Sequence, residues 1–191
     1  RNKKKIIKLS RNTIYDSVVE TLKQKEVINK NTLTVTIHRT ENIYSKKNLE
    51  SLISLLIKLK NENLYNEIEW YCHDITINAL QNNNFIEILS DNDVQIKELI
   101  LHSEFINKIY SSKAIITDGG SIAEECSIMN LQTVIWRDVV ENKEYLNKNM
   151  LLSKYNHDEI IKFLNKKSDG KKLSIDENSP SEQFVEQLMS L

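Results

Sequence analysis

The polar run Thr-Ile-His-Arg-Thr-Glu-Asn, residues 36–42, carries side chains that could bind an anion and transfer a proton. The ordinary pKa of His38 lies near neutrality, so its imidazole could donate a hydrogen bond to a diphosphate or stabilise a leaving group. Arg39 adds a fixed positive charge in a planar fork, and Glu41 could hold either residue. The competing interpretation is an exposed polar loop before a helix that Asn42 or Ser45 caps.

A second chemical feature is a glycine pair that follows a β-branched apolar run. Asp118 ends the run, and Gly119 and Gly120 supply two of the three glycines of the chain. Ser121 then predicts the start of a helix, with Glu124 as its capping-box partner. A strand, a glycine turn and a helix N-terminus in this order would present bare backbone N–H groups to an anion such as a phosphate.

Other side chains near these two stretches indicate a binding role less clearly. Glu125 could accept hydrogen bonds from a ribose diol, whereas Glu124 suits a surface acid that the helix dipole favours. Phe105 could stack on a base, although a core phenylalanine at a helix start explains it equally well. His102 and His157 suggest no role beyond the surface or a helix cap. No Cys and His spacing predicts a zinc site, and no P-loop or G-x-S-x-G pattern is present.

These residues need a scaffold that brings separate parts of the chain together. Hydrophobic periodicity and β-branched runs predict strands that alternate with helices. The expected strands are residues 4–9, 33–38, 68–73, 94–101, 114–117, 133–136 and 150–152. The expected helices are residues 12–29, 46–60, 104–111, 121–130, 158–166 and a last one from Pro180, with 75–83 as a short helix or irregular link, 140–148 as a polar helix and 167–180 as a polar loop.

This alternation predicts a doubly wound, Rossmann-like α/β domain with a parallel sheet and helices on both faces. Ligands of such sheets bind outside the carboxyl ends of the strands. His38, His73, Asp118 and Arg137 each lie at the carboxyl end of an expected strand. We therefore expect a ligand site at this edge, and the alternative is that strand ends simply carry polar residues.

Composition narrows the class of protein. The 191 residues are 40% apolar and 28% charged with a net charge of −1, which suits a globular domain and offers no basic field for nucleic acid or an anionic membrane. No apolar run reaches the roughly 18 residues that span a bilayer. Cys72 and Cys126 lie in apolar surroundings and are expected to be buried thiols, which favours a cytoplasmic protein.

Three motifs resemble those of one protein family. Residues 36–42 contain the pattern T-x-H-R-x-E-N in full, residues 117–126 are similar to T-D-S-G-G-x-x-E-E-A, and residues 11–17 are similar to G-N-x-x-x-D-A. In these motifs the chain resembles the carboxyl-terminal half of the non-hydrolysing UDP-N-acetylglucosamine 2-epimerases. The resemblance implies a two-domain, glycosyltransferase-B-like fold, of which residues 1–191 would be the carboxyl-terminal, UDP-binding domain.

The resemblance also implies roles for individual residues. His38 would lie at the diphosphate as a catalytic group, Phe105 would stack on uracil and Glu125 would accept the ribose hydroxyls. The implied reaction converts the GlcNAc unit to ManNAc by anti elimination of UDP and its re-addition, and it needs no metal and no cofactor. The implied UDP-binding residues are His38, Arg39, Phe105, Gly119, Gly120, Ser121 and Glu125, with support from Glu41, Asp118, Arg137 and Lys143.

The chain departs from the family pattern at two places. Gly119 stands where the family has serine, and Ser121 stands where it has the last glycine. Asn142 replaces an arginine, whose charge Lys143 could supply without the fork. Two alternatives to the implied epimerase therefore stay open. One is a hydrolysing enzyme that releases ManNAc and UDP, and the other is a non-catalytic domain that binds a nucleotide-sugar.

The expected partners are a UDP-sugar and an amino-terminal domain of the same protein. In the family that domain carries the catalytic carboxylates, so these residues alone are expected to bind UDP weakly and to catalyse nothing. The last helix, about residues 181–191, is expected to pack back toward that domain. A homodimer is a further expectation.

Overall fold

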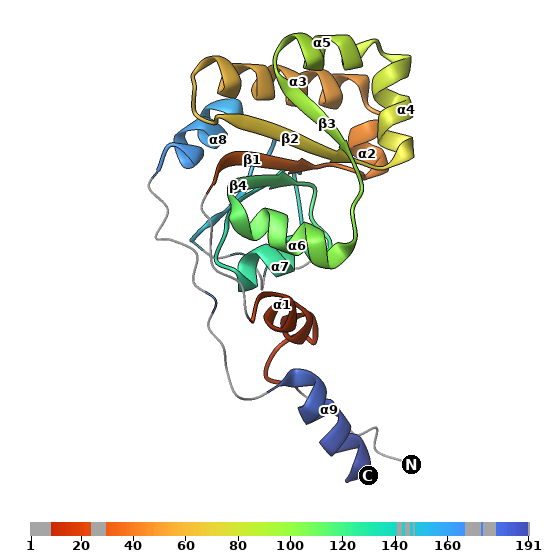
Figure 1. The fold of residues 1–191 in the computed structure, drawn as a ribbon, viewed down its shortest axis with the longest axis vertical. Coiled ribbons are helices and arrows are strands. Elements are labelled where there is room, and N and C mark those ends of the chain that lie inside the picture. Colours follow the sequence, from red (N-terminus) through yellow and green to blue (C-terminus); the bar gives the residue numbers. More distant parts are fainter. Residues whose placement is uncertain are drawn as a thin grey trace.

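The computed structural model describes residues 9–23, 30–140, 143, 146, 148–166, 173 and 179–190. Within these residues, six parallel strands form one sheet in the order β3-β2-β1-β4-β5-β6 (Figure 1). The order reverses between β1 and β4, where doubly wound sheets bind their ligands. The predicted Rossmann-like sheet is confirmed. The strands are β1 Lys30–Thr36, β2 Glu67–Cys72, β3 Val94–Glu98, β4 Ser112–Thr117, β5 Gln132–Ile135 and β6 Met150–Leu152.

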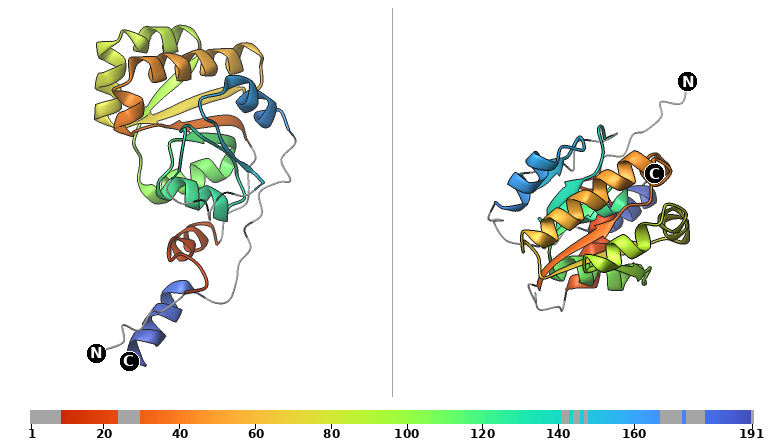
Figure 2. Two further views of the ribbon diagram at one scale, coloured as in Figure 1. Left: turned by 180° about the vertical axis from the view of Figure 1, so that it is seen from behind. Right: turned by 90° about the horizontal axis from the view of Figure 1, so that it is seen from above.

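Helices cover both faces of the sheet (Figures 1 and 2). One core joins the sheet to α2, α3, α4, α5 and α8, and a second core joins it to α1, α6 and α7. The helices are α1 Ile14–Leu22, α2 Thr40–Ile43, α3 Lys46–Asn61, α4 Asp74–Asn82, α5 Phe85–Asp91, α6 His102–Ser111, α7 Ser121–Ile128, α8 His157–Leu164 and α9 Pro180–Met189.

The two faces of the sheet share its residues alternately between the two cores. Trp70 and Ile116 pack into the first core, and their neighbours Tyr71 and Ile115 pack into the second. Since both faces are covered, the strands are continuous buried runs, as in β1, whose last five residues are all buried. This packing holds the strand ends in place for the loops that follow them.

Helix α3 illustrates how local sequence and packing agree. The Ser45 hydroxyl caps its first turn by accepting a hydrogen bond from the Asn48 N–H at 3.3 Å. Full burial of one large aliphatic side chain contributes about 1.5–3 kcal/mol. The structure confirms the prediction of a helix over 46–60 and places its end at Asn61. The buried side chains are Leu49, Leu52, Ile53, Leu55, Leu56 and Leu59.

Several predicted boundaries were wrong. The short helices α2 and α5 were not predicted, and α5 follows Asn84, whose φ of 58° is left-handed. Strand β3 ends at Glu98 and not at 101, because residues 99–101 leave the sheet with their apolar side chains exposed. The expected segments 4–9, 140–148 and 167–180 lie largely outside the described residues, as does the end of the helix expected over 12–29.

Helix α9 lies beside α1, away from the sheet (Figures 1 and 2). Ser179 caps it and Pro180 is its first residue, as Pro180 predicted. The Ser181 N–H donates to Asp16 Oδ2 at 2.9 Å, and this bond helps to lower the pKa of Asp16 against the opposing effect of burial, which raises it. The side chains of Phe184 and Val185 in α9 are exposed. Packing of this helix on another domain stays a prediction.

Candidate functional site

The candidate site lies at the carboxyl ends of β1 and β4, the switch point of the sheet. The loop after β1 contains His38 and Arg39, and the turn after β4 contains Asp118 to Gly120. In the sheet Thr36 pairs with Thr117, so the two strands end side by side. The register therefore brings together two motifs that lie about 80 positions apart in the chain.

Asp118 joins these two motifs directly. Its Oδ2 atom accepts hydrogen bonds from the backbone N–H groups of His38 at 2.9 Å and Arg39 at 2.7 Å. The Asn42 side-chain amide donates to the same oxygen at 3.3 Å and to the Trp136 carbonyl at 3.3 Å. Asp118 is only 4% exposed. Asp118 thus holds the histidine loop against the glycine turn, and its support of UDP binding stays a prediction.

The glycine turn has the backbone that its sequence predicted but a different cap. Gly119 and Gly120 have φ values of 101° and 71°, which a side chain would strain. Gly120 occupies the N-cap position of α7, and Ser121 is the first helical residue with an exposed side chain. The capping-box prediction was wrong, because no side chain caps α7 and Glu124 accepts a hydrogen bond from the Asn12 amide at 2.6 Å.

The approach to this turn is open. Among the described residues, a Cβ atom on Gly120 would meet no atom within 4 Å, whereas one on Gly119 would lie 4.0 Å from Arg137 Cδ. The first N–H groups of α7 have no intrahelical acceptor, as at any helix N-terminus. An anion could therefore reach the backbone at Gly120 and Ser121 without displacing a side chain.

His38 is held by two threonine hydroxyls. The Thr76 hydroxyl donates to the Ile37 carbonyl at 3.2 Å, so its oxygen is left to accept from His38 Nδ1 at 3.4 Å. The network therefore assigns the proton to Nδ1 and leaves Nε2 to accept from the Thr36 hydroxyl at 2.7 Å. Burial and the neighbouring His73, whose ring centroid lies 4.3 Å away, lower the pKa of His38 to about 4.

Two arginines approach the same loop around one carboxylate. Glu41 Oε1 lies 3.5 Å from an Arg137 guanidinium nitrogen and 4.0 Å from one of Arg39. Arg137 follows β5 and is 9% exposed. The structure thus brings Arg39, Glu41 and Arg137 together. Lys143 is exposed, and Asn142 lies outside the described residues.

A cavity of about 200 Å³ opens at the ends of β1, β2 and β3. Phe105 of α6 forms part of its wall and packs edge-on against Tyr71, with ring centroids 5.4 Å apart. Phe105 is only 8% exposed, so it belongs to the core as well as to the cavity. Burial confirms the interpretation of Phe105 as a core residue, and its stacking on a base stays a prediction. The lining residues are Thr36, His38, His73, Leu99, Ile100, His102, Phe105 and Ile122.

Glu125 and His102 form a pair that the sequence did not predict. His102 Nε2 lies 2.7 Å from Glu125 Oε1, and the Glu125 side chain is 3% exposed. Burial raises the pKa of Glu125, while the hydrogen bond from His102 lowers it. His102 was expected only at the surface or at a helix cap, and the structure adds its contact with Glu125. Its only signal in the sequence is a spacing of one helical turn from Phe105.

Three expectations concern the rest of the chain. Cys72 and Cys126 are free and buried, as predicted. The described residues contain no group of three His, Cys, Asp or Glu side chains arranged to hold a metal ion. In the same part of the chain, every helix is too short or too polar to traverse a lipid bilayer.

The strand order, the glycine turn and the motif loops at the switch point define a Rossmann-like domain of the kind that forms one half of two-domain, glycosyltransferase-B-like proteins. The chain belongs to the UDP-N-acetylglucosamine 2-epimerase family, whose family model matches residues 4–185.

Individual relatives agree with this family. The UDP-N-acetylglucosamine 2-epimerase of Methanocaldococcus jannaschii is 27% identical over 180 residues, which are 84% of this chain and 48% of that protein. The enzyme of the same name from Methanococcus maripaludis is 29% identical over 161 residues, 72% of this chain and 41% of that protein. This chain thus spans about half the length of these relatives.

A solved structure has the same fold. The crystal structure of Methanocaldococcus jannaschii UDP-GlcNAc 2-epimerase in complex with UDP-GlcNAc and UDP superposes with a TM-score of 0.80 and 24% sequence identity. The match covers 94% of this chain and 54% of that one. The fold of one half of that protein is therefore the fold of this chain.

Proposed function

We propose that this chain is the UDP-binding domain of a UDP-N-acetylglucosamine 2-epimerase that interconverts UDP-GlcNAc and UDP-ManNAc. The observation that carries the proposal is the position of His38 and Phe105 in the wall of one cavity, which opens at the end of β1 beside the switch point. A nucleotide whose base stacks on Phe105 would extend its phosphates toward the turn at Gly120, where the backbone is open to an anion. The family membership of the chain supports the same ligand.

Each group at the switch point suits one part of UDP. Phe105 stacks on uracil, and Gly120 and Ser121 contact the diphosphate through backbone N–H groups, next to Gly119, whose own N–H donates to the Thr117 hydroxyl at 3.3 Å. Arg39 and Arg137 add positive charge beside the phosphates, and Glu41 holds their guanidinium groups. The ribose lies toward Glu125. Lys143 is an additional charge near the diphosphate, in the place of the missing arginine.

The reaction breaks the C2–H bond and the bond between C1 and the β-phosphate oxygen. A base takes the C2 proton, the electron pair of that bond forms the C1–C2 double bond, and UDP leaves with the C1–O pair. UDP then adds back to the 2-acetamidoglucal, and a proton returns to the opposite face of C2. The charge that develops on the leaving UDP is the charge that this domain must stabilise.

His38 is suited to that task because it is neutral before the diphosphate arrives. Burial and His73 keep its pKa at about 4, and a diphosphate beside the ring favours the protonated form and raises that pKa. His38 then donates a hydrogen bond to the leaving oxygen, while the Asp118 carboxylate holds the loop that carries it. The base that takes the C2 proton belongs to the amino-terminal domain of the protein.

A calorimetric titration tests the binding half of the proposal. The 191-residue chain should bind UDP weakly and should not convert UDP-GlcNAc, because the groups that handle the C2 proton lie elsewhere. Nanomolar affinity for UDP, or turnover of UDP-GlcNAc by these residues alone, would contradict it. Absence of any UDP binding would contradict the assignment of the site itself.

The complete reaction is tested after addition of the expected amino-terminal domain to this chain. Proton NMR then follows UDP-GlcNAc over time. UDP-ManNAc as the product supports the proposed function. Free ManNAc with UDP would instead identify a hydrolysing enzyme, and binding without turnover would identify a non-catalytic domain.

A further inference from the structure

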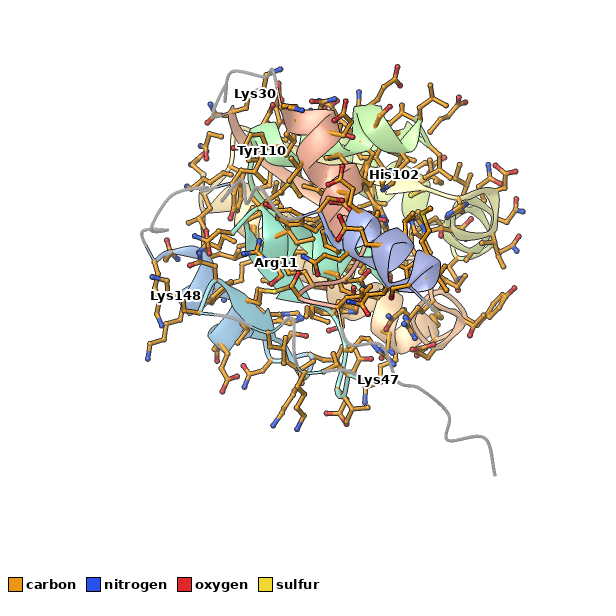
Figure 3. The ribbon with its side chains drawn as sticks, turned by 90° about the horizontal axis from the view of Figure 1, so that it is seen from below. Arg11, Lys30, Lys47, His102, Tyr110 and Lys148 are labelled. Atoms are coloured by element: carbon orange, nitrogen blue, oxygen red, sulfur yellow. The ribbon has the colours of Figure 1, made fainter. Side chains whose placement is uncertain are left out.

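Tyr155 reaches the candidate site from the far edge of the sheet. It follows β6, which is the last strand in the sheet order, whereas the histidine loop follows β1. In Figure 3, Lys148, two residues before β6, lies on the opposite side of the view from His102, which begins α6. The Tyr155 hydroxyl nevertheless donates a hydrogen bond to Asn42 Oδ1 at 3.3 Å, between residues 113 positions apart.

The backbone at Tyr155 has an uncommon conformation that its surroundings hold in place. Lys154 and Tyr155 have φ values of 47° and 59°, and two successive left-handed residues without glycine are rare. The Lys154 N–H donates to the Arg137 carbonyl at 2.9 Å, and the Tyr155 N–H donates to the buried Ser153 hydroxyl at 3.2 Å. The Tyr155 ring packs edge-on against Trp136, with ring centroids 5.3 Å apart. These contacts direct the Tyr155 hydroxyl toward the loop after β1.

Asn42 connects this hydroxyl to the centre of the site. Its Nδ2 atom donates to Asp118 Oδ2 and to the Trp136 carbonyl, both at 3.3 Å. A carboxylate and a carbonyl can only accept hydrogen bonds, so they fix which end of the Asn42 amide faces them. Oδ1 of Asn42 therefore faces the Tyr155 hydroxyl, and its other contact is the Asn48 amide at 3.5 Å. Because Asn42 is 1% exposed, loss of the hydroxyl would leave a buried acceptor with one long contact.

The hydrogen bonds continue from Asn42 to the histidine loop. Burial raises the pKa of Tyr155, so its hydroxyl stays a donor at neutral pH. Asp118 Oδ2 accepts the Asn42 amide and also the backbone N–H groups of His38 and Arg39. A shift of the Asn42 amide would therefore disturb the oxygen on which both N–H groups depend.

Resting on the proposed function, we propose that Tyr155 is a positioning residue for UDP binding. Its hydroxyl holds the Asn42 amide against Asp118, and through Asp118 it sets the histidine loop beside the glycine turn. Tyr155 acts on the nucleotide only through these two side chains. The loop after β6 is thereby tied to the ends of β1 and β4.

Tyr155→Phe removes the hydroxyl and keeps the ring against Trp136. Without ligand, this variant of the 191-residue chain should shift the backbone amide NMR signals of His38 and Arg39. Its dissociation constant for UDP should rise about threefold to tenfold, the usual effect of one lost hydrogen bond. Tyr65→Phe is the matched control, because Tyr65 is 2% exposed before β2 and its hydroxyl has no hydrogen-bond partner among the described residues. The control should keep the wild-type amide signals and UDP affinity.

A double variant tests the path of this effect. In Asp118→Asn the hydrogen-bonded chain has already lost its charged acceptor, so the further change Tyr155→Phe should raise the UDP dissociation constant by less than about twofold. Urea unfolding of each variant separates binding from stability. A tyrosine that only stabilised the fold would lower the free energy of unfolding and leave the UDP affinity of the folded chain unchanged.

Each contrary result has its own meaning. If Tyr155→Phe leaves either the His38 and Arg39 signals or the UDP affinity unchanged, Tyr155 does not position the loop and the inference is wrong. If its effect on affinity adds in full to that of Asp118→Asn, it reaches the ligand by another route and the inference is also wrong. If the wild-type chain does not bind UDP, the proposed function fails, while the amide signals without ligand still decide whether Tyr155 holds the loop.

Discussion

Asp118→Ala should destabilise the fold and weaken nucleotide binding together. In the wild type, one carboxylate oxygen accepts the backbone N–H groups of His38 and Arg39 at 2.9 and 2.7 Å, and the Asn42 amide at 3.3 Å. Alanine leaves the two backbone donors of the loop without this acceptor. The loop that carries the His38 imidazole then loses its attachment to the glycine turn.

The expected loss of unfolding free energy in Asp118→Ala follows from these hydrogen bonds. Hydrogen bonds to a charged group contribute about 1.5–3 kcal/mol each. The lower value applies here, because removal of a 4% exposed carboxylate also returns part of its desolvation cost. Two such bonds give a loss of about 3 kcal/mol. Asp118→Asn keeps an oxygen acceptor without the charge, so its cost should be about 1 kcal/mol.

Urea unfolding of the variants measures these free energies, and UDP titration measures the loss of binding. Asp91→Ala is the matched control, because Asp91 is exposed at the end of α5 and its loss should change stability by less than about 0.5 kcal/mol. An Asp118→Ala cost below about 1 kcal/mol, or a UDP affinity equal to that of the wild type, would refute the role of Asp118 as the link between the two motifs.

Two further predictions concern the same loops. Gly120→Ala should lower the free energy of unfolding in urea by about 1–3 kcal/mol, because Gly120 has a φ of 71°. It should also weaken UDP binding, because the added methyl group lies where the phosphate is expected. Unchanged binding would argue against that contact. The pKa of His38 is about 4 in the folded chain and near 6.5 when unfolded, so stability should fall by about 1–2 kcal/mol from pH 7 to pH 4, after allowance for the partial exposure of the ring. His38→Gln should remove that part of the pH dependence, and an unchanged slope would show that other groups cause it.

Much of the fold was predictable because its signals are local. The six buried leucines and isoleucines of α3 repeat with a helical period, and Ser45 marks its start. The β-branched runs of β1 and β4 indicate strands on their own. Helices with weak local signals were missed. The single turn of α2 has too few residues to show a helical period, and its position depends on contacts of Asn42 with Asp118 and Trp136.

The candidate site was predictable only in part. The motif residues His38, Arg39 and Glu41 could be chosen from their spacing, and the rule for doubly wound sheets placed them near Asp118. The capping box was not predictable in this way, because Ser121 lies inside the helix and Glu124 bonds to Asn12 of a distant segment. His102 has no motif, and its importance appears only when α6 and α7 are packed together.

The sequence alone determined the alternation of strands and helices, the positive φ values at the glycine pair and the family motifs, since each depends on residues that are neighbours in the chain. Tertiary structure decided that Asp118 holds the histidine loop, that His102 contacts Glu125 and that α9 lies against α1. These contacts join residues from 23 to 165 positions apart. They depend on the order and register of the strands and on the rotation of each helix, which local propensity does not specify.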